Sequence, residues 1–156
     1  VTFTLILWSN NMAITTSVLT NSFKKELLEG THNFKQTGGN SFKLALYTNS
    51  AVLGKSTTSY TTDGEVSASG QYVASGKALV NGGTSVATNT AIVDFADRSY
   101  TGVTLTARGA LIYNDTASGD PAVAVLDFGS DKTATSGTFT IQFLAFTTSA
   151  AIIRIS

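Results

Sequence analysis

The sequence predicts an all-β protein: a β-sandwich of the jelly-roll or Greek-key type with one short N-terminal helix and an extended N-terminal arm. Three observations predict this class. Threonine and valine, which favour pleated strands, are abundant; apolar and polar residues alternate in short runs after residue 41; and turn-forming residues separate those runs. With 156 residues the chain fits one β-rich domain at 21–156, preceded by an arm at 1–20.

The N-terminal arm begins with an apolar run, Val1 to Trp8. This run is too short for a membrane-spanning helix, which takes about 20 apolar residues. It also has no basic segment ahead of it, so a secretory signal peptide fits poorly. Thr2 and Thr4 alternate with apolar neighbours, which favours a strand or an extended arm. Alternatively, Met12 is the natural start and residues 1–11 are an upstream extension.

One short helix is expected at 22–29. Asn21 and Ser22 are favourable N-cap residues, and Gly30 is typical of the position just beyond a helix C-terminus. Phe23 and Leu27 share one face of this helix. Two turns are not stable alone in water, so we expect the helix to dock on a sheet or on another subunit.

Later segments have the two-residue period of strands. Four runs put their apolar residues on one face and point Asp94, Thr138, Thr140 and Gln142 outward. These inward sets are Phe42, Leu44 and Leu46; Ala91, Val93 and Phe95; Val103, Leu105 and Ala107; and Phe139, Ile141 and Phe143. Two further runs, 122–126 and 151–155, are apolar on both faces. Each of these two is therefore expected to be a central strand covered on both sides, or to have one face in an interface.

Turn signals separate the runs at 38–40, 63–64, 81–83, 114–119 and 136–137. Their spacing predicts about eight or nine short strands, as in a sandwich or barrel. Residues 51–70 are rich in serine, threonine and glycine. We expect a long loop there, with at most one weak strand near 59–62.

The composition excludes several kinds of chemistry. The chain has no cysteine, which excludes disulfides, thiolate metal sites and cysteine nucleophiles. Ten basic residues balance ten acidic ones, so the basic footprint of a nucleic-acid binder is absent. A net charge near zero gives little electrostatic protection against self-association.

Candidate catalytic residues are few. The single histidine, His32, follows the expected helix in a polar loop, where we expect it to be solvated and without a chemical role. Two carboxylate pairs, Asp94 with Asp97 and Asp127 with Asp131, could serve a glycosidase. Their places on a strand and in turns favour ordinary bonds to nearby backbone instead.

One segment of the sequence resembles a metal site, namely a calcium-binding loop. Residues 114–120 put Gly119 at the sixth position of such a loop, but position twelve is Val125, which cannot ligate. A hairpin loop joining 109–113 to 121–128 is the simpler interpretation. We therefore expect no catalytic, cofactor-binding or metal-binding residues, and no enzyme activity.

Aromatic residues could form a platform for a carbohydrate or a nucleic acid. The candidates for surface positions are scattered and form no stripe; they are Tyr47, Tyr60, Tyr72, Tyr100 and Trp8.

Several phrases of the sequence resemble one family. Residues 107–114, 122–129, 137–143 and 151–155, together with 22–30 and 44–48, resemble small virion structural proteins of tailed bacteriophages, of the head decoration or cement type. The resemblance covers about residues 12–156 and includes no catalytic signature. Leu144, Ala145 and Phe146 stand where this family leads one to expect a proline-led turn.

The resemblance implies a protein that binds the outside of a phage head. Its expected partners are the major capsid protein, or other virion proteins, and copies of itself in a homotrimer or homodimer. Neither nucleic acid nor a membrane is an expected partner. A tail or neck structural or adhesin module is the alternative, and a glycan-acting enzyme is a remote one.

Overall fold

The protein is described here from a computed structural model, which covers residues 2–4 and 14–156. Strands make up 48% of the structure and helix 6%. The elements are β1 (Thr2–Thr4), β2 (Val18–Leu19), α1 (Asn21–Leu28), β3 (Phe42–Tyr47), β4 (Lys77–Ala78), β5 (Asn81–Ala87), β6 (Thr90–Phe95), β7 (Arg98–Asn114), β8 (Ala122–Gln142) and β9 (Ile153–Ile155).

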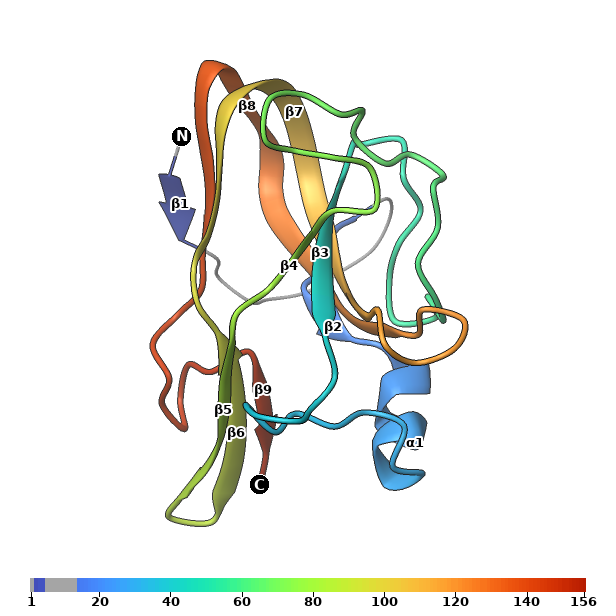
Figure 1. The fold of residues 1–156 in the computed structure, drawn as a ribbon, viewed down its shortest axis with the longest axis vertical. Coiled ribbons are helices and arrows are strands. Elements are labelled where there is room, and N and C mark those ends of the chain that lie inside the picture. The colour runs from blue at the N-terminus through green and yellow to red at the C-terminus, as the bar shows by residue number, and fades with distance from the viewer. Residues whose placement is uncertain (1, 5–13) are drawn as a thin grey trace.

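The strands form two sheets (Figure 1). The large sheet has the order β1-β8-β7-β3-β4, and β2 also pairs with β8; the small sheet has the order β5-β6-β9. All pairings between these strands are antiparallel except β1 with β8, which is parallel. The all-β sandwich with a short helix near the N-terminus is thus confirmed.

The large sheet is covered on both faces. Leu44, Ile112 and Leu126 belong to the main core, which also takes in Val93 and Ile153 from the small sheet. The opposite face of the large sheet forms a second cluster with the loop after β3. Its members are Ile14, Ala45, Tyr47, Ala51, Leu53, Leu111, Tyr113, Ala122 and Val125. Residues 122–126 are apolar on both faces because segments of the same chain cover both faces.

Two expected turns lie inside strands instead. Residues 81–83 coincide with a register shift in the pairing of β5 with β6, and 136–137 with one in β8, where Ser136 has a φ of 46°. Such β-bulges use the same residue types as turns, because the extra residue needs an unusual backbone conformation. Because 136–137 is a bulge and not a turn, the runs at 122–128 and 138–142 belong to one 21-residue strand, β8. The runs at 103–107 and 109–113 likewise belong to one strand, the 17-residue β7.

The expected helix is confirmed, one residue earlier than the sequence indicates. Its N-cap is Thr20, whose Oγ1 accepts the backbone N–H of Phe23 at 3.2 Å. Phe23 is the buried anchor of α1, and Gly30 follows the helix with a φ of +76°. The helix docks on its own chain, beside β8.

The long loop after β3 contains no strand at 59–62. It is tied down by isolated bridges, among them Ser59 to Pro121 and Tyr47 to Glu65. The prediction that Ala91 is buried is wrong, because Ala91 is exposed. Val93 and Phe95 of the same set are buried. Of the helices in the described residues, none is long and apolar enough to cross a membrane.

Candidate functional site

The aspartate expected to point outward from a strand, Asp94, is buried. The residue is only 5% exposed, and its Oδ1 accepts the N–H of Phe95 at 2.8 Å. The carboxyl also accepts the N–H of Ile152, just before β9. Burial raises the Asp94 pKa, and the neighbouring charge of Asp97 raises it further. This group fastens β9 to β6.

The other candidate carboxylates bond to backbone or to single polar partners. Asp97 accepts the N–H of Phe143 at 2.9 Å, and Asp131 accepts the Asn49 amide at 2.9 Å. Asp127 pairs with Arg108 at 3.2 Å and accepts the Gly129 N–H at 2.8 Å. These bonds hold loops and the irregular stretch of β8 after Asp127.

The expectation that His32 is solvated is wrong, because the ring is buried. Its Nε2 lies 2.9 Å from Glu26 of α1, and its Nδ1 lies 3.1 Å from the Asn114 amide nitrogen. Asn114 Nδ2 can only donate, so Nδ1 accepts and Nε2 carries the proton that is donated to Glu26. His32 therefore joins the helix to the end of β7.

The loop at 114–120, compared above with a calcium loop, is a hairpin connection between β7 and β8. Asn114 is buried, and its Oδ1 accepts the N–H groups of Thr116 and Ala117. Asp115 forms an ion pair with Lys43 at 2.8 Å. Within the described residues no group of three or more histidine and acidic side chains is placed to hold a metal ion.

The tyrosines expected at the surface are mostly internal. Tyr47, Tyr72 and Tyr100 are fully buried and Tyr60 is partly buried, while Trp8 lies outside the described residues. The prediction of a surface position is therefore wrong for three of the five aromatic residues, Tyr47, Tyr72 and Tyr100.

A polar cluster forms around Glu65 instead. Its carboxylate accepts the hydroxyls of Tyr60 at 2.5 Å and Tyr72 at 2.8 Å, and the N–H of Ser75 at 2.7 Å. Burial raises the pKa of both tyrosines, which keeps their hydroxyls protonated as donors. The cluster anchors the loop between β3 and β4.

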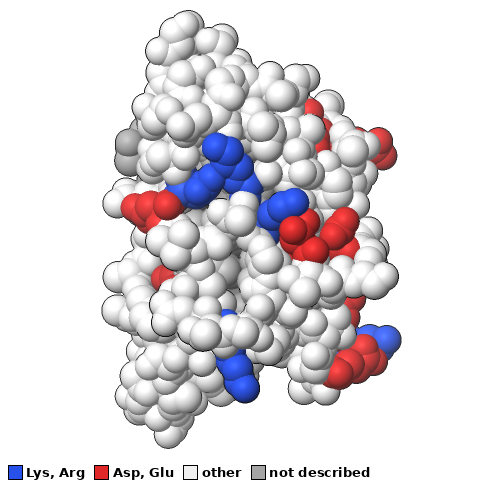
Figure 2. Space-filling view, in the orientation of Figure 1, with Lys and Arg blue, Asp and Glu red and all other residues white. Residues whose placement is uncertain are grey.

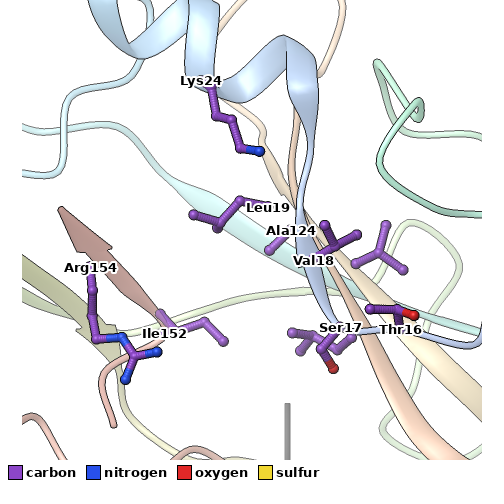
Figure 3. Close-up of a pocket in the computed structure, with 10 residues that line it drawn as sticks. Thr16, Ser17, Val18, Leu19, Lys24, Ala124, Ile152 and Arg154 are labelled. Atoms are coloured by element: carbon purple, nitrogen blue, oxygen red, sulfur yellow. The ribbon is translucent and has the colours of Figure 1, made fainter. Parts of the chain in front are cut away.

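A hollow of about 390 Å³ opens beside β2 (Figure 3). Leu19, Ala124 and Ile152 contribute apolar surface to it. Lys24 of α1 and Arg154 of β9 reach it from two sides, and none of the described residues that line it is acidic. Neither cation forms an ion pair with a carboxylate of the described residues.

A second hollow, of about 480 Å³, lies between the segment after α1 and one face of the small sheet. Its walls are mostly apolar and include Leu27, Phe34, Val93 and Ile153.

An exposed apolar row continues from this second hollow across the small sheet. Val86 pairs with Ala91, and Ala91 with Ile155, so the three side chains share one face. All three are exposed, Val86 at 71% and Ile155 at 52%. We refer to Val86, Ala91 and Ile155 as the apolar row. Exposed apolar surface that adjoins a hollow is typical of protein-binding sites.

Charged side chains are few on the surface of this protein, so they shield little of its apolar surface from contact with a partner. Figure 2 shows that most of one face of the molecule carries neither acidic nor basic groups.

Comparison of the chain with protein-family models, with curated proteins and with solved structures finds no match.

Sequence reasoning missed the apolar row and both hollows. Ala91 is on the same face of β6 as the buried Val93 and Phe95, so its exposure depends on how far along the strand the core extends, and no periodicity within 90–95 reveals that. The run at 151–155 was the available signal, since it predicted either a covered central strand or an interface face. β9 is an edge strand of the small sheet, so the central-strand alternative for this run is wrong, and its Ile155 is exposed.

Proposed function

We propose that this protein is a structural component of a tailed-bacteriophage virion, most specifically a decoration protein that binds the outside of the head shell. The observation that carries the proposal is the apolar row on the small sheet, next to the second hollow. Exposed apolar side chains in register across three strands suit contact with another protein surface. The resemblance of residues 12–156 to decoration and cement proteins supplies the identity of the partner.

The proposal assigns the apolar row to association, either with the major capsid protein or with copies of this chain. The shared core holds the strands of the apolar row in place, so little conformational entropy is lost when the row binds a partner. No catalytic step is part of this function.

Binding to phage heads tests the proposal. Purified protein is mixed with undecorated heads of the phage that encodes it, and co-sedimentation and heat release of DNA are measured. We expect co-sedimentation and a higher release temperature, because a ligand that binds only the intact shell stabilises it. Val86→Lys and Ile155→Lys should each abolish binding, whereas Val52→Lys, at a site 89% exposed on a loop, should not.

Three outcomes overturn the proposal. In the first, the wild-type protein stays monomeric by light scattering and never sediments with heads. In the second, electron microscopy finds it in the tail or neck, which favours the alternative. In the third, all three lysine variants bind like the wild type, which removes the apolar row from the interface.

A further inference from the structure

A strand edge of the small sheet is open beside two chemically different hollows. β9 is at the end of the order β5-β6-β9 and pairs only with β6 among the described residues. An unpaired strand edge presents backbone N–H and C=O groups to any extended segment that reaches it. In Figure 1, β9 lies on the side of its sheet nearer to α1.

The side chains of β9 and its approach alternate between the two hollows. Ile152 and Arg154 line the first, with Lys24 of α1 on another wall. Ile153 and Ile155 line the second, with Leu27 of α1 across it. Both hollows thus reach from β9 to α1, which lies on the side of the small sheet where β9 is the edge strand (Figure 1).

A strand added to this edge would alternate in the same way, because successive side chains of a strand point to opposite faces. One set of its side chains would enter the first hollow, towards Lys24 and Arg154. The other set would enter the second hollow, whose walls are mostly apolar but include Lys35. The two cations have no carboxylate partner in the described residues, and no acidic residue lines the first hollow. Charge complementarity therefore favours acidic side chains in the first set.

We infer that β9 is a docking edge for an extended segment of a partner protein in which acidic and apolar residues alternate. The backbone of the segment pairs with β9, its carboxylates meet Lys24 and Arg154, and its apolar side chains fill the second hollow. This inference goes beyond the proposed function, because strand addition at β9 requires no phage particle.

A synthetic peptide tests the inference directly. The probe is the acetylated and amidated peptide Val-Glu-Val-Glu-Val-Glu-Val with a fluorescein label, and binding is measured by anisotropy at neutral pH. We expect binding to the wild-type protein and a loss of about tenfold in affinity in Lys24→Glu and in Arg154→Glu, as for charge pairs at a partner surface. Lys55→Glu is the matched control, since Lys55 is an exposed lysine outside both hollows, and its affinity should stay within about twofold of wild type.

Two further probes separate strand addition from simple charge attraction. The same peptide with alternate amides N-methylated, prepared in both registers, keeps its charges but loses backbone donors, and at least one register should bind about tenfold more weakly. In amide NMR spectra, the probe should shift the signals of β9 and leave the opposite edge, β5, unchanged.

The inference is overturned if the probe does not bind, or if the matching Val-Lys peptide binds equally well. It is also overturned if both N-methylated peptides bind like the parent, or if Lys55→Glu weakens binding as much as the two hollow variants. Because these measurements use isolated protein, they can succeed where head binding fails, and the reverse.

Discussion

At the scale of single residues, polar groups inside this protein are structural. His32 and Asp94 look solvent-exposed in the sequence, yet each is buried and hydrogen-bonded to two different segments. A buried polar group costs free energy unless its bonds are made. His32 joins α1 to the end of β7, and Asp94 joins β6 to the start of β9.

Asp94 should make stability depend on pH in an unusual direction. Its pKa is raised in the folded protein, so the folded state binds the proton more tightly than the unfolded state does. Its contribution to the free energy of unfolding is then greatest at low pH and falls as pH rises from the ordinary aspartate pKa of 3.8 to the raised value. Asp94→Asn should remove this fall.

Urea unfolding from pH 3 to pH 7 measures the effect. The free energy of unfolding of wild type minus that of Asp94→Asn should decrease as pH rises through this window. Asp131→Asn, at an exposed carboxylate, serves as the control and should show no such trend. A difference that increases with pH would contradict the conclusion that burial disfavours the ionised form of Asp94.

At the scale of elements, the loop between β3 and β4 depends on one carboxylate. Glu65→Ala removes the acceptor of two tyrosine hydroxyls and of one backbone N–H. We expect a loss of about 2–3 kcal/mol in the free energy of unfolding, because buried donors are left unpaired. Limited proteolysis should cut faster between residues 49 and 76.

Asp63→Ala is the control for this change, since Asp63 is exposed in the same loop. Glu65→Gln, which keeps the shape and one acceptor oxygen, should fall between the control and Glu65→Ala. Equal protease sensitivity in Glu65→Ala and wild type would show that the loop is held by its apolar contacts alone.

The turn that leads into β4 tolerates only glycine. Gly76 has a φ of +72°, and a Cβ there would overlap the carbonyl of Leu44. Gly119 has a similar φ of +84° but open space around it. Gly119→Ala should therefore cost about 1 kcal/mol, for the backbone alone.

Gly76→Ala should cost about 3 kcal/mol or more, since β3 must also move away from the new methyl group. Thermal unfolding of the two variants compares these costs. Similar losses in both variants would mean that the approach of this turn to β3 adjusts without strain.

At the scale of the whole molecule, the two sheets share one core. Phe95 of β6 contacts the rings of both Phe42 and Phe143, and all three are buried in the main cluster. Phe95→Ala should lower the free energy of unfolding by about 3–5 kcal/mol, by loss of burial and formation of a cavity. Val86→Ala, on the exposed apolar row, should change it by less than about 0.5 kcal/mol.

Unfolding of wild type and of Phe95→Ala should remain one cooperative transition. Near-ultraviolet circular dichroism reports the buried tyrosines, and the far-ultraviolet signal reports the strands. Coincident midpoints in both variants are expected for a shared core. Separate midpoints would show that the small sheet unfolds independently of the large one.

Several features of this protein follow from the sequence alone. The alternation in 138–143 placed Phe139 and Ile141 inside, and the residues around Phe23 and Gly30 located the helix to within one residue. These features are local: period, capping and propensity act over a few neighbouring residues. The all-β class follows from them.

Tertiary structure decided the rest, because burial depends on segments that are distant in the chain. A glycine signal at 81–83 can mark a turn or a bulge, and only the neighbouring strand determines which. Tyr72 can be internal because the Leu46 backbone and Glu65 satisfy its hydroxyl. Ala91 is exposed because the core that buries Val93 and Phe95 on the same face of β6 does not extend to the start of the strand. The open edge of β9 and the two hollows beside it arise in the same way, from what the chain leaves uncovered once its core is filled.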